Sequence, residues 1–164
     1  MFTIRKATPN DAAILQQVAK PIWWHTYLPL LTEDHVAYMF NERYSIKELT
    51  EQIEQSIQTY LLLFEDSELV AFASYGPRED DPQVYKLHKL YCLPSTQGKG
   101  YGKALINEVF KNVAALGIKT LELNVNRYNK SCGFYEKMGF TVAYEEDIPI
   151  GPYWMNDYVM RKEL

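Results

Sequence analysis

The hydrophobic pattern of the chain changes once, near residue 58. Before that point apolar residues recur every three to four positions, which is the spacing of helices with one buried face. After it, short apolar runs are typical of strands, and two further helical patterns interrupt them. The early pattern predicts three helices, over residues 8–27, 31–45 and 45–57.

Polar residues at the starts of these segments predict where each helix begins. Asn10 or Asp11 can cap the first helix, and Thr32 can cap the second. Ser45 and Glu48 have the spacing of a capping box ahead of the third. The expected inward residues are Ile14, Leu15 and Val18 in the first helix, Val36, Met39 and Phe40 in the second, and Ile46, Leu49, Ile53 and Ile57 in the third. We also expect Pro21 to end or kink the first helix.

The later pattern predicts strands with a long and a short helix between them. A hairpin is expected around the acidic turn that contains Asp66 and Glu68. The strands are expected over residues 2–8, 59–66, 68–76, 83–93, 119–126, 140–148 and 153–163, and the helices over 102–117 and 129–139. The long helix should bury Leu105, Val109, Val113 and Leu116. This order predicts one α/β (α+β) domain over residues 1–164, with a mixed, largely antiparallel sheet of about seven strands and a helical crossover after the fourth.

Composition narrows the function classes. The chain is 47% apolar and 23% charged, which is typical of a folded globule. A net charge of -4 disfavours a nucleic-acid partner, because phosphate backbones bind clustered Lys and Arg. Cys92 and Cys132 lack the spacing of a zinc site, so no metal is expected. With neither a signal-peptide pattern nor an apolar run of membrane-spanning length, we expect a cytoplasmic protein without a membrane partner.

The stretch "LYCLPSTQGKGYGKALINEVF" places three glycines ahead of the long helix. A Walker A loop is excluded because Gly98 and Gly102 are one residue too close and Lys103 is followed by Ala104. The dinucleotide fingerprint is disfavoured because its third glycine would fall on Lys103. Two interpretations stay open: a tight strand-to-helix turn, or a loop whose backbone N–H groups bind a phosphate at the start of the helix.

Two motifs carry a resemblance to a known family. "QGKGYG" is similar to the Q/R-x-x-G-x-G/A signature of the GNAT superfamily of N-acetyltransferases, and "NKSCGFYEKMGF" resembles that family's N…FYxxxGF segment. The predicted element order is similar over nearly the whole chain. More loosely, "PIWWHTYLPLLTEDHVAYMFNERYSIKELTEQI" and "IPIGPYWMNDYVM" resemble the bacterial spermidine/spermine N-acetyltransferase branch.

The resemblance implies acetyl-CoA as co-substrate and assigns residues to it. The pyrophosphate would bind the loop, and the pantetheine arm would pair with the preceding strand, which splays from its neighbour at a β-bulge. A backbone N–H near Leu90 or Tyr91 would polarise the thioester carbonyl. The implied cofactor-binding residues are Leu90, Tyr91, Cys92, Gln97, Gly98, Lys99, Gly100, Tyr101, Gly102, Lys103 and Asn129.

The same resemblance assigns Tyr135 as the acid that protonates the departing thiolate, a role suited to a phenol that stays protonated at neutral pH. Thiol nucleophilic catalysis is disfavoured, because neither cysteine has an evident histidine partner. No general base is singled out: a water chain would also serve, and the side chains that could act are Glu145, Glu146, Asp147, His88 and Asp157.

The acceptor is expected to be a primary amine, with a small molecule such as a polyamine favoured and attacking directly in a ternary complex. An aromatic wall of Trp23, Trp24, Tyr27 and Tyr38 could hold an ammonium group by cation–π contact, unless these rings are core residues. The acids of residues 145–147 could attract a distal charge. A protein N-terminus or lysine, or a non-catalytic acetyl-CoA sensor, are the alternatives. A homodimer through an exposed final strand is also conceivable.

Overall fold

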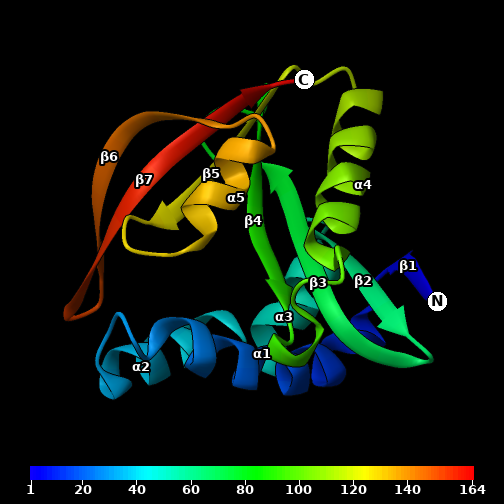
Figure 1. The fold of residues 1–164 in the computed structure, drawn as a ribbon, viewed down its shortest axis with the longest axis horizontal. Helices are drawn as coiled ribbons and strands as arrows, with labels where there is room; N and C mark the ends of the chain where they lie inside the picture. Colours follow the sequence, from blue (N-terminus) through cyan, green and yellow to red (C-terminus); the bar gives the residue numbers. More distant parts are fainter.

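A computed structural model describes residues 1–164 and contains one seven-stranded sheet in the order β1-β2-β3-β4-β5-β7-β6 (Figure 1). The strands are β1 Phe2–Lys6, β2 Thr59–Glu65, β3 Glu68–Pro77, β4 Val84–Cys92, β5 Thr120–Asn126, β6 Thr141–Ile150 and β7 Tyr153–Glu163. All neighbours are antiparallel except β4 and β5, which the crossover helix α4, Tyr101–Ala115, connects. The predicted mixed, largely antiparallel sheet is therefore confirmed.

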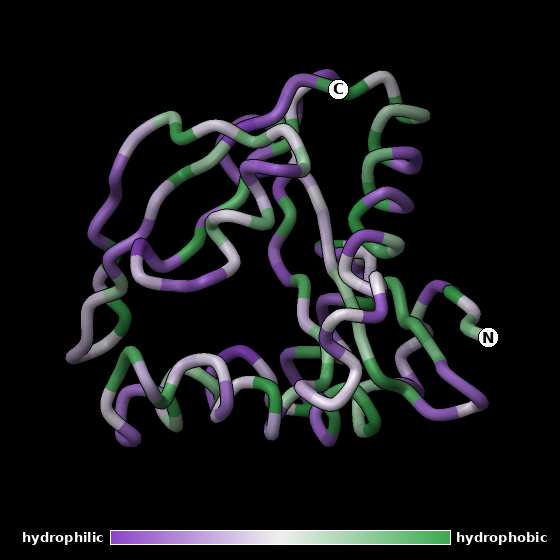
Figure 2. The backbone as a smooth tube through the Cα atoms, viewed as in Figure 1, coloured by the Kyte–Doolittle hydropathy of each residue, from purple (hydrophilic) through white to green (hydrophobic).

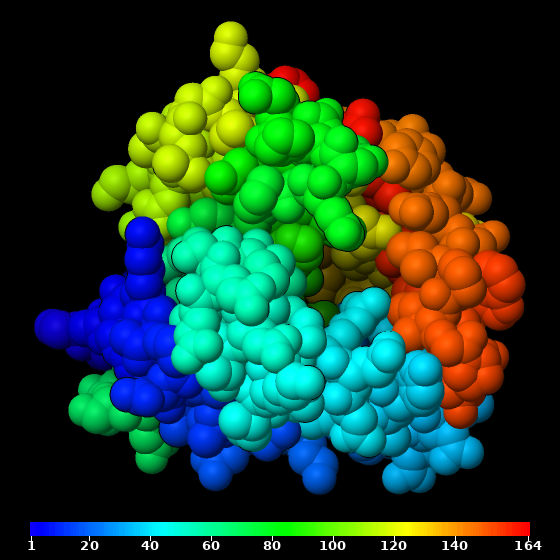
Figure 3. All heavy atoms as spheres, turned by 180° about the vertical axis from the view of Figure 1, so that it is seen from behind, coloured from blue at the N-terminus to red at the C-terminus, as the bar shows by residue number.

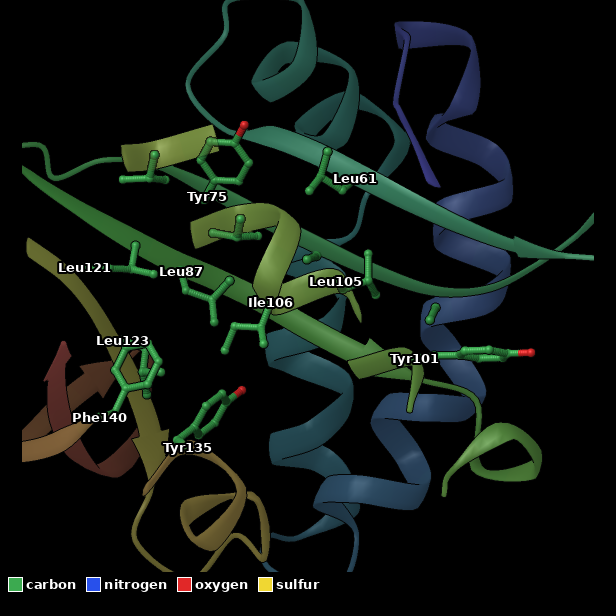
Figure 4. Packing of buried hydrophobic residues seen from close by; sticks show 14 of the residues in the cluster. Leu61, Tyr75, Leu87, Tyr101, Leu105, Ile106, Leu121, Leu123, Tyr135 and Phe140 are labelled. Carbon is green, nitrogen blue, oxygen red and sulfur yellow. The ribbon is translucent and has the colours of Figure 1, made fainter. Parts of the chain in front are cut away.

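Helices cover both faces of the sheet, and each face has its own apolar cluster. Helices α1 (Ala12–Tyr27), α2 (Glu33–Arg43) and α3 (Ile46–Glu54) pack on one face around Trp23, Tyr44 and Phe72. Helices α4 and α5 (Ser131–Lys137) pack on the other, over the cluster that includes Leu105 and Tyr135 (Figure 4). The hydropathy along α4 alternates with its turns, as expected for a helix with one buried face (Figure 2).

The predicted caps are confirmed for two helices. Thr32 Oγ1 accepts the backbone N–H of His35, and Ser45 Oγ accepts that of Glu48. The Glu48 carboxylate accepts a hydrogen bond from Gln52 at 2.9 Å and does not complete the capping box. Asp11 occupies the predicted N-cap position of α1, but its side chain makes no cap bond to that helix. Its carboxylate instead accepts hydrogen bonds from the Thr8 N–H and from Arg5, across the 3₁₀ turn (Pro9–Asp11) that precedes α1.

Several residues expected on inward faces lie at the surface. Ile14 (36% exposed) is at the edge of its stripe, Ile46 (42%) is the first residue of α3, and Leu116 (61%) follows the end of α4. Ile57, at 50%, lies beyond the end of α3. The regular periodicity is lost at helix ends, which explains the exposure of Ile46, Leu116 and Ile57.

Pro21 does not end the first helix, because α1 continues to Tyr27 with the proline on its exposed side. Ile22 and Trp23, which follow it, are almost fully buried against the sheet. Tertiary packing thus outweighs the loss of one backbone hydrogen bond.

A second correction concerns the final strand, which was expected to be exposed. Strand β7 lies between β5 and β6, so it is not an edge strand and cannot pair with a second copy.

Candidate active site

Strands β4 and β5 separate partway along the sheet. They pair only from Val84 to Leu87 on β4, whereas β4 continues to Cys92 beside β3 alone. On the β3 side the register jumps from Leu87 to Lys89, so His88 is an extra, bulged residue. The bulge lies where the pairing with β5 stops, and the sheet opens there between β4 and β5.

A cavity of about 790 Å³ runs along this opening, between β4, β5, α5 and the glycine loop. It brings together every residue that the sequence assigned to acetyl-CoA except Lys99, and Tyr135 lines it too. The ammonium group of Lys99 lies 3.0 Å from the Glu65 carboxylate instead, outside the cavity. Tyr101 also donates its hydroxyl to Glu65, so the chain offers its backbone rather than its phenol to a ligand.

The glycine loop presents unpaired backbone donors. Gly98 and Gly100 have φ angles of 87° and 82°, in the left-handed region that favours glycine. No hydrogen bond within the chain uses the N–H groups of Gly98, Gly100, Tyr101, Gly102 and Lys103. The first turn of α4 carries no acidic residue and no side-chain cap. These donors, together with the positive end of the helix dipole, suit a di-anionic group such as a pyrophosphate.

Tyr135 lines the cavity from α5, and its ring packs against Phe134. It also packs against Phe140 (Figure 4). Its hydroxyl makes no side-chain hydrogen bond within the chain. Burial raises the pKa of Tyr135 above its usual value, with smaller contributions from Tyr27 and Cys92, so the phenol keeps its proton. Burial also raises the pKa of the Cys92 thiol to about 11, which leaves it a poor nucleophile at neutral pH.

A second cavity, of about 460 Å³, lies on the face of the sheet covered by α1, α2 and α3. Figure 3 shows the hollow from behind, between the cyan helices, green β4 and the orange β6–β7 hairpin. The two cavities meet along β4 and β5, because both are lined by Tyr27, Leu87, His88, Lys89, Tyr91 and Asn124. The two cavities are therefore neighbours on either side of these residues.

Only His88 and Asp157, of the five possible bases, line the second cavity. The acids of residues 145–147 lie on the exposed strand β6, where Arg127 pairs with Glu145 and Asp147 at 3.7 and 2.6 Å. Burial lowers the pKa of His88 to about 3, with further lowering by Lys86, Lys89 and Arg43. An imidazole with so low a pKa holds a proton poorly.

The expected aromatic wall is partly core. Trp23 and Tyr27 line the second cavity, whereas Trp24 and Tyr38 do not. The indole of Trp23 donates a 2.9 Å hydrogen bond to Tyr44, and the hydroxyls of Tyr27 and Tyr91 lie 2.8 Å apart.

Sequence analysis did not single out the cations of the second cavity, Arg43, Lys86 and Lys89, or its amides Asn124 and Asn126. One signal was present in the sequence. Lys86 and His88 alternate with leucines, and Lys89 breaks that alternation in a strand expected to be buried. Such a break of phase is typical of a β-bulge beside a site.

No helix of the chain is long and apolar enough to cross a membrane. No group of three or more His, Cys, Asp and Glu side chains is arranged to hold a metal ion.

The chain is similar to known proteins in both sequence and fold. The model of the acetyltransferase (GNAT) family matches residues 22–140. An uncharacterized N-acetyltransferase of Mycobacterium tuberculosis is 31% identical over 94% of this chain and 99% of its own length. The spermidine N(1)-acetyltransferase of Thermoplasma acidophilum is 29% identical over 98% of this chain and 96% of its own. The crystal structure of the PaiA N-acetyltransferase from the same organism, in complex with coenzyme A, has a TM-score of 0.86 and 30% identity and covers 100% of this chain and 99% of its own. The chain belongs to the GNAT family of N-acetyltransferases.

Proposed function

We propose that the chain transfers the acetyl group of acetyl-CoA to a primary amine of a small molecule, with both substrates bound at once. The observation that carries this proposal is the meeting of two cavities along β4. One has the free amides that suit a pyrophosphate, and the other opens to the opposite face. The arrangement favours direct attack in a ternary complex, because burial raises the pKa of both half-buried thiols and leaves neither poised as a nucleophile.

The residues of the first cavity have separate tasks in this proposal. The amides from Gly98 to Lys103 bind the pyrophosphate, and Gln97 lies beside them. The unpaired edge of β4 from Leu90 to Cys92 binds the pantetheine arm, and an N–H there polarises the thioester carbonyl. Asn129 uses its Oδ1 to accept the Ser131 N–H at 2.8 Å, which leaves its Nδ2 free for the arm.

Acetyl-CoA supplies the acetyl group as a thioester: the amine nitrogen bonds to the carbonyl carbon as the C–S bond breaks, and Tyr135 gives its proton to the departing sulfur. The proton that the amine loses passes to solvent, which reprotonates Tyr135. Its raised pKa supports this role, because the phenol is protonated across the physiological range. The acceptor amine enters through the second cavity, whose volume of about 460 Å³ suits a small molecule. A polyamine is the first acceptor to test, given the spermidine-acetylating relative.

The test combines calorimetry with free-thiol release. We expect acetyl-CoA to bind, and at least one compound among spermidine, other diamines, amino acids, aminoglycosides and a short peptide to release free coenzyme A. Absence of acetyl-CoA binding would contradict the proposal. Turnover on the peptide alone would favour a protein acetyltransferase, and binding without any turnover would favour a sensor.

A further inference from the structure

Charged side chains line the second cavity without neutralising one another. Arg43, Lys86 and Asp157 all face it, yet none has an opposite charge within the 4.0 Å of an ion pair. Neither cation makes a side-chain hydrogen bond within the chain. In the rest of the molecule most arginines pair with carboxylates, as Arg78 and Arg161 do with Glu122. The cavity thus separates one buried acid from two unpaired cations.

The acid is placed to receive an ammonium group. Asp157 is only 5% exposed, and its Oδ2 accepts a 3.3 Å hydrogen bond from Asn124. Its Oδ1 is buried without any partner, which is costly for a polar atom. Asn124 lines both cavities, so Asp157 lies beside their junction. An acceptor amine must come to this junction to reach the thioester.

Two cations line the second cavity together with Asp157. Arg43 is the last residue of α2, and Lys86 lies on β4 ahead of the bulge. Both line the second cavity but not the first. The bulge at His88 lets Lys86 and Lys89, three positions apart, face the same side of the sheet. Arginine and lysine ends without partners suit a carboxylate or phosphate, which accepts several hydrogen bonds at once.

The charges that act on His88 are positive. Next to burial, the groups that lower the pKa of His88 are Lys86, Lys89 and Arg43, with no carboxylate acting against them. Two glutamates, Glu42 and Glu48, also line the cavity, and the Glu48 carboxylate accepts a hydrogen bond from Gln52. A cavity lined by side chains of both signs suits an acceptor that carries both an ammonium and an anionic group.

We propose that the acceptor is an amine that also carries an anionic group, with Asp157 holding the ammonium end and Arg43 and Lys86 binding a carboxylate or phosphate at the other end. This inference rests on the proposed acetyl transfer and narrows its substrate class.

Matched pairs of acceptors test the inference by free-thiol release at saturating acetyl-CoA. Lysine is cadaverine with an added carboxylate, and phosphoethanolamine is ethanolamine with an added phosphate. In at least one pair the anionic member should have a kcat/KM at least tenfold higher, and it should exceed that of spermidine. Equal use within both pairs, or a preference for spermidine, would overturn the inference while the proposed acetyl transfer stands. No turnover with any amine would instead contradict the proposed function.

Substitutions of Arg43 and Lys86 test whether these side chains bind the anionic group of the acceptor. Arg43→Gln and Lys86→Gln should each raise the KM for the preferred anionic acceptor roughly ten- to hundredfold, which corresponds to one lost charge-assisted contact. The kcat/KM for the matched amine that lacks the anionic group should be unchanged or higher. Lys47→Gln is the matched control, because Lys47 is an exposed lysine of α3 outside both cavities. An unchanged KM in both variants, with thermal melts like those of the parent, would refute the anion site.

Discussion

The ammonium group of Lys89 donates a 2.6 Å hydrogen bond to the hydroxyl of Tyr60, on the face of the sheet that α1, α2 and α3 cover. Tyr60 in turn donates to Gln52, and Gln58 accepts a second bond from Lys89 at 3.2 Å. No carboxylate contacts Lys89, so a buried lysine is held by neutral acceptors at the junction of the two cavities. Burial lowers its pKa from 10.5 to about 7.

This lysine should make stability depend on pH. Between about pH 7 and pH 10.5 the unfolded chain binds a proton at Lys89 that the folded chain does not, so stability rises as the pH rises. The gain from Lys89 between pH 7 and pH 9 should be about 2 kcal/mol. Urea unfolding at several pH values measures it, and Lys89→Met should remove it. Lys47→Met should retain it, and a Lys89→Met curve parallel to that of the parent would contradict the assignment.

Glu122 should stabilise the paired ends of the strands below the opening. It is 3% exposed, and its Oε2 accepts from Arg161 at 2.8 Å and from Arg78 at 3.2 Å. Glu122→Gln should lower the free energy of unfolding by about 1–3 kcal/mol, because two guanidinium groups lose their shared carboxylate. Glu163→Gln, which alters an exposed carboxylate bonded to Thr120, should change it by less than about 0.5 kcal/mol. Equal effects in urea titrations would argue against a stabilising role for Glu122.

The elements of the fold were predictable because each depends on local pattern. The buried stripe of α4 and the hairpin at Asp66 follow from residues close in sequence. The lining of the first cavity was predictable for the same reason, since Gln97 to Lys103 form one contiguous loop. Lys99 departs from the expectation because Glu65, 34 positions away in the sequence, binds its side chain.

The lining of the second cavity could not be predicted in this way. Arg43, Lys86 and Asp157 come from α2, β4 and β7, and only the sheet order brings them together. The clustered acids of residues 145–147 were the groups expected from the sequence to attract a charged acceptor, but the structure places them on the exposed edge strand β6. Burial of a charged residue is a tertiary property, and no local pattern encodes which of several acids lies inside.

Gly100→Ala should weaken acetyl-CoA binding. The residue has a φ of 82°, so an alanine there should cost about 1 kcal/mol of stability. Its added methyl would meet nothing in the chain and would stand in the cavity beside the free amides. We expect at least a tenfold loss of affinity by calorimetry.

Gly117→Ala is the matched control, because Gly117 has a φ of 80° and equally open surroundings just beyond the other end of α4. It should show the same loss of stability with unchanged affinity. If both variants bind acetyl-CoA alike, the loop does not hold the pyrophosphate.

Tyr135→Phe should slow acetyl transfer while leaving acetyl-CoA binding intact. The substitution removes only a hydroxyl that makes no side-chain hydrogen bond within the chain, so the ring packing against Phe140 persists. Loss of a general acid lowers kcat by about 10²–10⁴-fold, and the dissociation constant should stay within about twofold. Tyr144→Phe, on the exposed strand β6, should leave both quantities unchanged. A kcat for Tyr135→Phe equal to that of the parent would mean that the thiolate takes its proton from elsewhere, since the raised pKa of Tyr135 keeps it protonated across the assay range.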